Sequence, residues 1–200
     1  MDKLYWETYF VDTFQEYLQK TESAAQTLFE GIDKYLEIIN SVPLDDVGSS
    51  ATWNIAQKKF LYESFAMATI SGAVLQLAYM AIKQYSNHAS APEQFDALIK
   101  KNSPAEKFCI GREIRSIPIG LIIYAGRNQA AHYDDSDLRE PNRSIFENLC
   151  NRTSRAGKEY RDPAYDLGNG ITVSFAANIT ALLGWRSYNT YLDDMRNLLI

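Results

Sequence analysis

The chain has 200 residues, of which 46% are hydrophobic and 22% charged, a composition that excludes an intrinsically disordered protein. Its net charge of −5 excludes a protein covered with positive charge for nucleic-acid binding. The two cysteines, Cys109 and Cys150, have neither the spacing of a metal site nor the pattern of a disulfide framework. A length of 200 residues suits one domain, which we expect over residues 1–200. The sequence starts without a recognisable signal peptide, so we expect a cytoplasmic location.

The hydrophobic pattern predicts an all-α fold, an up-and-down bundle of about five to six helices. A long amphipathic helix is expected from Thr8 to Asn40, because apolar residues recur there at three- and four-residue intervals. The segment Ser41–Ser50, which contains proline and glycine, is expected to be a turn. A second long helix is expected from Thr52 to Tyr85.

Within this second helix, Phe65–Ile82 is uncharged for eighteen residues, which is the lower limit of length for a membrane span. Polar or small residues interrupt it, among them Thr69, Gly72 and Gln76, and its flanking lysines show no bias toward one side. These features favour a buried core or dimer-interface helix, so we expect no membrane association.

The next part of the chain is expected to form a short helix over Pro92–Lys100 and then another that starts at Ser103-Pro104-Ala105-Glu106. This tetrapeptide combines a capping serine, a first-turn proline and an acidic residue near the positive end of the helix dipole. The predicted helix carries Arg112, Glu113 and Arg115. Pro118 is expected to kink it or restart it as a central helix over Ile117–Tyr133.

After His132 the periodicity weakens, and a long, partly irregular loop is expected before the last helix. Inside this loop, Ser144–Cys150 is expected to form a short helix and Leu167–Ile171 a tight turn or small hairpin. The last helix is expected from Ser174 to about Asn197.

The central helix changes character along its length. Its first half, Ile117–Ala125, is apolar on every side, which is typical of a helix in the protein core. Its end carries Arg127, Asn128 and His132, and cationic side chains at the end of a core helix are costly to desolvate unless they are paired or used. Tyr124, Asn128 and His132 are spaced four residues apart and fall on one stripe of the helix. The spacing therefore permits a shared polar site.

The run Arg127-Asn128-Gln129-Ala130-Ala131-His132 resembles the R-x(4–6)-H signature of the HEPN superfamily, in which Asn commonly follows the Arg. The resemblance covers six residues of 200. It implies an all-helical domain with the metal-independent RNase activity found in toxin–antitoxin and phage-defence systems. It further implies a homodimer in which two motifs face each other across one cleft, RNA as substrate, no cofactor, and an antitoxin or inhibitor protein as a further partner.

The residue types of this motif suit RNA cleavage, in which the 2′-hydroxyl attacks the neighbouring phosphate. His132 is the candidate general acid or base, because the pKa of histidine lies near neutrality. Arg127 is the candidate phosphate stabiliser, and Asn128 the candidate positioning residue. Six further residues are candidates for RNA binding: Arg112, Arg115, Tyr124, Tyr133, Arg139 and Arg143.

The charge distribution leaves two interpretations open. Residues 100–161 hold 12 basic and 8 acidic side chains, in contrast to 6 basic and 13 acidic ones in residues 1–99. The basic section either attracts phosphate near the motif or forms an ordinary solvated face. The alternative to an endoribonuclease is thus a noncatalytic, HEPN-like helical domain that binds a protein or a nucleotide.

Overall fold

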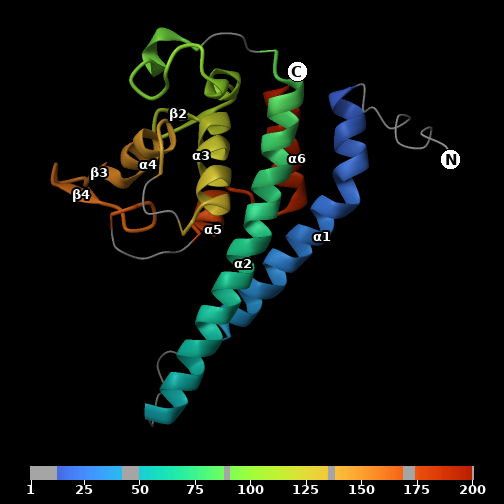
Figure 1. Ribbon diagram of the computed structural model, residues 1–200. Helices are drawn as coiled ribbons and strands as arrows, with labels where there is room; N and C mark the ends of the chain where they lie inside the picture. Colours follow the sequence, from blue (N-terminus) through green and yellow to red (C-terminus); the bar gives the residue numbers. More distant parts are fainter. Residues whose placement is uncertain (1–12, 42–49, 88–90, 135–137, 169–173, 200) are drawn as a thin grey trace.

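The computed structural model describes residues 13–41, 50–87, 91–134, 138–168 and 174–199. Helices dominate these residues, and the strands are two or three residues long, which confirms the predicted all-α class. The described residues contain six α-helices, which are labelled in Figure 1: α1 Phe14–Asn40, α2 Ser50–Tyr85, α3 Ile119–Ala131, α4 Asn142–Cys150, α5 Ala176–Leu183 and α6 Tyr188–Leu198.

Helices α1 and α2, with 27 and 36 residues, are longer than the other described helices and form an antiparallel pair (Figure 1). Helix α1 begins with a capping box, in which the Thr13 side chain and the Glu16 side chain each accept a hydrogen bond from the other's backbone N–H. The predicted beginning at Thr8 lies outside the described residues. The end of α1 and the beginning of α2 extend past the body formed by the other helices (Figure 1).

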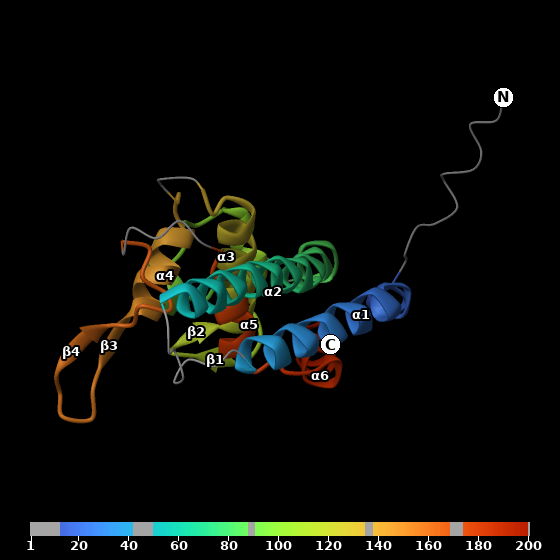
Figure 2. The ribbon, with the colours of Figure 1, turned by 90° about the horizontal axis from the view of Figure 1, so that it is seen from below.

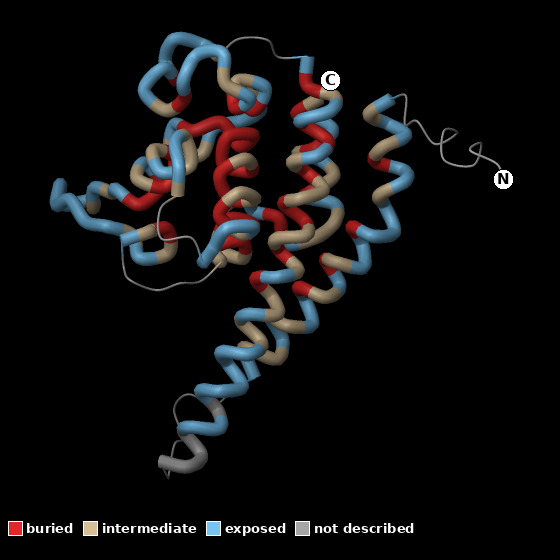
Figure 3. The backbone as a smooth tube through the Cα atoms, in the orientation of Figure 1, coloured by how far each residue is buried: buried red, intermediate tan, exposed pale blue. Residues whose placement is uncertain are grey.

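Helix α3 lies in the middle of the core, as its apolar sequence predicts. It packs against α2, α4 and α5, and Leu121, Ile122 and Ile123 have no exposed surface (Figure 3). The packing is close, because a Cβ atom on Gly126 would lie 2.9 Å from Ile179 Cγ2. This buried rod fixes the position of the polar residues at its C-terminal end.

The predicted helix through Arg112 and Arg115 is wrong. A 3₁₀ helix, η2, covers Pro104–Phe108, and the chain then forms a tight hairpin of β1, Glu113–Ile114, and β2, Ile117–Pro118. Both residues of its two-residue turn, Arg115 and Ser116, have positive φ angles of 56° and 62°. Two consecutive left-handed residues are the geometry that matches the twist of a two-residue hairpin.

The region before the last helix is more ordered than predicted. The expected helix over Ser144–Cys150 is present as α4, which begins at Asn142. A second hairpin then pairs β3, Asn151–Thr153, with β4, Glu159–Arg161, and projects from the body (Figure 2). The turn predicted at Leu167–Ile171 lies partly outside the described residues.

The predicted single last helix is wrong, because the segment forms two helices. Gly184, which follows α5, has a φ of +76° and stops that helix in the left-handed region that glycine favours. The 3₁₀ helix η1, Glu93–Phe95, likewise replaces most of the short helix predicted over Pro92–Lys100.

One described helical segment, Gln57–Tyr85 of α2, is long and apolar enough to cross a membrane. In its most apolar stretch of 18 residues, 39% of the stretch is buried inside the fold. Helix α2 packs against α1, α3 and α5. Val74, Leu75, Ala78, Ala81 and Ile82 are completely buried by these contacts. Its second half is therefore a core helix, as expected for Phe65–Ile82.

Candidate functional site

The candidate site lies at the C-terminal end of α3, where the buried helix reaches the surface. Arg127 and Asn128 are half-buried in its last turns, and His132 is exposed. The backbone N–H of His132 donates to the carbonyls of Asn128 and Gln129, so His132 is the residue that caps the helix. Its ring leaves the helix at the boundary with solvent, which suits a group that exchanges protons.

A cleft of about 460 Å³ opens beside this helix end. Its wall contains Tyr124, Asn128 and His132, which confirms that the predicted stripe shares one surface. The opposite wall comes from the segment before α4 and from its first residue: Leu138, Arg139, Glu140 and Asn142. Asn128 Nδ2 donates to Asn142 Oδ1 at 3.2 Å, and this bond ties the two walls together.

The Arg127 guanidinium is held by neutral groups. Its Nε–H donates to Gln76 Oε1 at 2.6 Å, and its Nη1–H donates to Asn128 Oδ1 at 3.1 Å. Its carbon atom Cζ lies 4.9 Å from the centre of the Tyr79 ring, which is a cation–π geometry. Among the described residues, no carboxylate forms an ion pair with Arg127. Its positive charge is therefore not neutralised by that part of the protein.

An aromatic cluster of Tyr79, Phe108 and Tyr124 packs next to Arg127 and Asn128. The Tyr124 ring contacts Phe108 at 4.9 Å and Tyr79 at 5.9 Å between ring centres. Burial raises the pKa of Tyr124, and the nearby Tyr79 raises it further. The hydrogen bond with Asn128 and the charge of Arg127 lower the pKa of Tyr124 and so oppose this effect. Tyr124 is therefore a neutral hydroxyl at physiological pH and offers the cleft a polar but uncharged group.

Arg127 also lines a second hollow, of about 420 Å³, on the α2 side of α3. Its floor is made of small residues, among them Ala68, Gly72 and Ala130, and Phe65 and Tyr133 contribute aromatic rings. The rings of Phe65 and Tyr133 meet edge to face at 6.5 Å between centres. In one chain, then, Arg127 opens toward this hollow and His132 toward the cleft, while Asn128 lies between them.

The structure places two of the predicted RNA-binding arginines away from the motif. Arg112 and Arg115 lie near the N-terminal end of α3, about 20 Å from its C-terminal end at 1.5 Å per residue. Arg112 pairs with Asp194, and Arg115 pairs with Asp162, donates to the Leu149 carbonyl and stacks on Tyr165. Both arginines have structural partners and do not join the motif.

The other predicted RNA-binding residues are closer to the motif. Arg139 and Tyr124 line the cleft, and Tyr133 lines the Arg127 hollow. Arg143 is exposed in the first turn of α4, one residue after Asn142. Among the described residues, Arg139 is the arginine that lines the cleft, and the carboxylate of Glu140 lines it as well.

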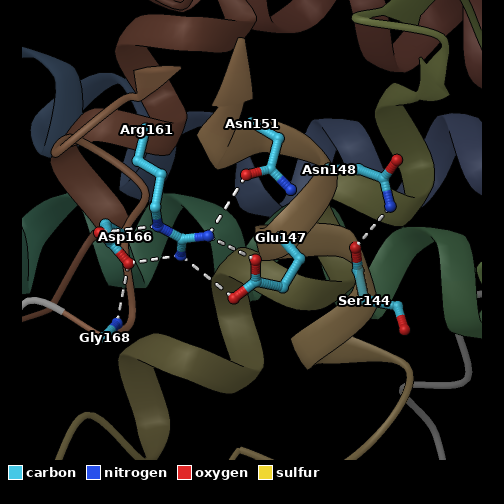
Figure 4. Close-up of polar contacts among 7 residues, drawn as sticks. All are labelled: Ser144, Glu147, Asn148, Asn151, Arg161, Asp166 and Gly168. Atoms are coloured by element: carbon cyan, nitrogen blue, oxygen red, sulfur yellow. Dashed lines mark hydrogen bonds and ion pairs between the residues drawn. The ribbon is translucent and has the colours of Figure 1, made fainter. Parts of the chain in front are cut away.

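A further arginine of the basic section, Arg161, is held in a polar cluster (Figure 4). It donates to both oxygens of Glu147, to both oxygens of Asp166 and to Asn151. These bonds attach the β3–β4 hairpin to α4 and to the following loop. They also hold the pKa of Glu147 and of Asp166 below the ordinary range of carboxyl groups.

Sequence reasoning missed Gln76 and Asn142, the two amide side chains that hold the motif. The sequence does hold a signal for Gln76, which is a polar residue in the uncharged part of α2, but such a residue is equally typical of an ordinary interruption of an apolar segment. Asn142 had no distinct signal. In the described part of the chain, no three His, Cys, Asp or Glu residues come close enough together to hold a metal ion.

Comparisons with protein-family models, with curated proteins and with solved structures find no match to this chain.

Proposed function

We propose that the protein is a cytoplasmic, metal-independent endoribonuclease of the HEPN type, active as a homodimer in a toxin or phage-defence role. RNA is its substrate, and an antitoxin or inhibitor protein is a further partner. The proposal assigns proton transfer to His132, stabilisation of the phosphate charge to Arg127, and positioning to Asn128.

One observation supports this proposal more than any other, namely the environment of Arg127. A structural arginine in a half-buried position is normally paired with a carboxylate, as Arg115 is with Asp162 in this protein. Arg127 instead has two amide oxygens and an aromatic ring as its neighbours among the described residues. An oriented, uncompensated guanidinium is a preorganised site for a phosphate, because its remaining N–H groups can bind two oxygens at once.

The positions of the other two residues suit the same chemistry. Asn128 bonds to Arg127 on one side and to Asn142 on the other, so it fixes the orientation of the guanidinium relative to the cleft. His132 is exposed one turn further on and lines that cleft. A phosphate near Arg127 with its ribose toward the cleft brings the 2′-hydroxyl and the imidazole to the same helix end.

The test is RNA cleavage in EDTA by the purified protein and by its His132→Ala variant. We expect the wild type to cleave single-stranded RNA and leave 2′,3′-cyclic phosphate or 3′-phosphate ends, and the variant to lose cleavage at least 100-fold, on the scale of general acid–base catalysis. Because His132 is exposed, the circular dichroism spectrum and melting temperature of the His132→Ala variant are expected to match those of the wild type.

The matched control is His88→Ala, since His88 is the other histidine of the chain. This variant is expected to retain full activity; His88 itself lies outside the described residues. Cleavage that survives in His132→Ala would remove the assignment of His132. Absence of cleavage by the wild type, over varied RNAs and with a stable dimer, would favour the noncatalytic alternative.

A noncatalytic, nucleotide-binding or protein-binding domain has one observation in its favour. Within a single chain, Arg127 opens toward the hollow beside α2, whereas His132 opens toward the cleft beside α4. Two catalytic groups that act on one phosphate must converge on it. Binding of RNA or nucleotide by the wild type with unchanged affinity in His132→Ala, and with no cleavage, is the outcome that this alternative predicts.

A further inference from the structure

The first half of α2 carries large apolar side chains that the described residues leave mostly exposed. Ile55, Leu61, Tyr62 and Phe65 are 71%, 56%, 71% and 61% exposed, and we refer to these four residues as the α2 patch. The beginning of α2, together with the end of α1, extends past the body (Figures 1 and 3). Soluble proteins rarely leave such neighbouring large apolar side chains in water unless a partner covers them.

Two residues of the α2 patch, Leu61 and Phe65, continue a face that is partly buried further along the same helix. Leu61, Phe65, Ala68, Gly72 and Gln76 follow one another at three- and four-residue spacing, so they lie on one side of α2. At Gly72 this side is in contact with the body, since a Cβ atom there would lie 3.5 Å from Ala130 Cβ. At Leu61 the same side is exposed. The face is thus built for helix packing over its whole length.

An exposed ring and a recess adjoin each other in this region. Tyr62 is 71% exposed, and Phe65, three residues further on, lines the hollow of about 420 Å³ that also contains Arg127. A two-fold interface uses the same surface on both subunits, so that surface must carry both the protruding group and the recess that receives it. An exposed ring beside a hollow is an arrangement that such an interface can use.

The area and the charges of the projecting pair also suit a second copy. Tyr62 and Phe65 together expose on the order of 250 Å², a core that a stable interface of about 800 Å² per partner can be built around. Two antiparallel helix pairs that pack on each other form a four-helix arrangement, which is a common stable unit. Exposed Lys58 and Lys59 on α2 and exposed Asp33 and Glu37 on α1 give the pair both signs of charge, as an interface between identical copies requires.

We propose that a second copy of the chain packs on the α2 patch, with Tyr62 of each copy directed into the hollow that contains the partner's Arg127. This inference rests on the dimeric form of the proposed function and assigns the surface through which the dimer forms. The hollow of Arg127 then has walls from two chains, and the two motifs lie on the same side of the dimer.

The first test is the mass in solution of the wild type and of Tyr62→Glu and Tyr62→Lys, measured by analytical ultracentrifugation. We expect a dimer for the wild type and a dissociation constant raised on the order of 100-fold in Tyr62→Lys, because an ammonium group replaces an apolar ring and faces the partner's Arg127. Tyr62→Glu is expected to dissociate less than Tyr62→Lys, because its carboxylate can pair with that Arg127. Tyr160→Ser is the matched control, since Tyr160 is 49% exposed on the remote β3–β4 hairpin and its loss leaves the dimer intact.

The second test does not depend on weakening the interface. Tyr62→Cys is expected to crosslink to a dimer with a short bis-maleimide, whereas Tyr160→Cys is not; the native Cys109 and Cys150 are both buried. A wild type that stays monomeric at 100 μM, or a Tyr62→Lys variant that dimerises as tightly as the wild type, would overturn the inference. The cleavage assay with His132→Ala is separate, so a dimeric nuclease with unaffected Tyr62 variants would retain the proposed function and lose only this interface.

Discussion

Gln76 and Arg127 are joined across α2 and α3 by a hydrogen bond of 2.6 Å from Arg127 Nε to Gln76 Oε1. Gln76, in the second half of α2, thereby orients the guanidinium of Arg127 near the C-terminal end of α3. Because the partner is an amide, the bond positions the guanidinium without cancelling its charge. Within the described residues, glutamine at this position therefore leaves the charge of Arg127 uncancelled.

The first prediction tests this relationship through Gln76→Glu. The new carboxylate would form a bidentate, charge-assisted pair with Arg127, which would compete with a bound phosphate. We expect RNA affinity, measured by fluorescence anisotropy, to fall by about 10-fold, with a melting temperature equal to or above that of the wild type. Gln84→Glu is the control, because Gln84 is exposed on the same helix and the change in net charge is identical. Equal affinities in the two variants would show that Arg127 does not bind the phosphate.

The second prediction concerns two helical glycines with different surroundings. A Cβ atom on Gly120 would lie 2.3 Å from the Phe108 carbonyl oxygen, a backbone atom that cannot move aside alone. Gly120→Ala should therefore lower the free energy of unfolding by about 3 kcal/mol. A Cβ atom on Gly72 would make ordinary contact with Ala130 Cβ at 3.5 Å, so Gly72→Ala should raise it by about 0.5–1 kcal/mol. Urea titration measures both, and similar values for the two variants would contradict the close packing of α3 on η2.

The all-α class, the two long helices and the buried central helix could be predicted from the sequence, because each has a sustained hydrophobic pattern. The stripe of Tyr124, Asn128 and His132 could be predicted for the same reason, since it depends only on helical spacing. The environment of Arg127 could not, because its partners Gln76 and Asn128 come from different helices and one is 51 positions away.

The errors have local causes. The turn at Arg115 and Ser116 uses two left-handed residues without the asparagine or glycine that normally signals such a turn, so the segment resembled a continuing helix. The contacts of Arg115 with Asp162 and with the Leu149 carbonyl stabilise it there, and they connect residues far apart in the sequence. At Gly184 a signal did exist, but one glycine in an apolar pattern is weak evidence against a longer helix.

The third prediction concerns Asp194, which joins α6 to the β1–β2 region. Its carboxylate accepts hydrogen bonds from Trp185 Nε1 at 2.8 Å and from Arg112 Nε at 2.9 Å, and Trp185 is buried. Asp194→Ala leaves a buried indole N–H without an acceptor, so the free energy of unfolding should fall by about 2 kcal/mol. The neighbouring, exposed Asp193 is the control, and Asp193→Ala should change it by less than about 0.5 kcal/mol. A urea midpoint unchanged in Asp194→Ala would contradict this role.

The last prediction concerns the acid sensitivity of the Arg161 cluster. Hydrogen bonds from Arg161 are the largest cause of the lowered pKa of both Glu147 and Asp166. A carboxyl group with a lowered pKa in the folded state contributes stability above its unfolded pKa, which is about 4.3 for Glu and 3.9 for Asp, and that contribution is lost as the pH falls through the folded value.

Arg161→Met should therefore melt at a lower temperature than the wild type between pH 5 and 7, and the difference should shrink progressively as the pH falls below about 4. Differential scanning calorimetry of both proteins across this range measures the effect. Arg155→Met, which removes an exposed arginine from the loop of the same hairpin, should have the same melting temperature as the wild type at every pH. A difference for Arg161→Met that persists unchanged at pH 3 would mean that its side chain stabilises the hairpin through packing and not through its ion pairs.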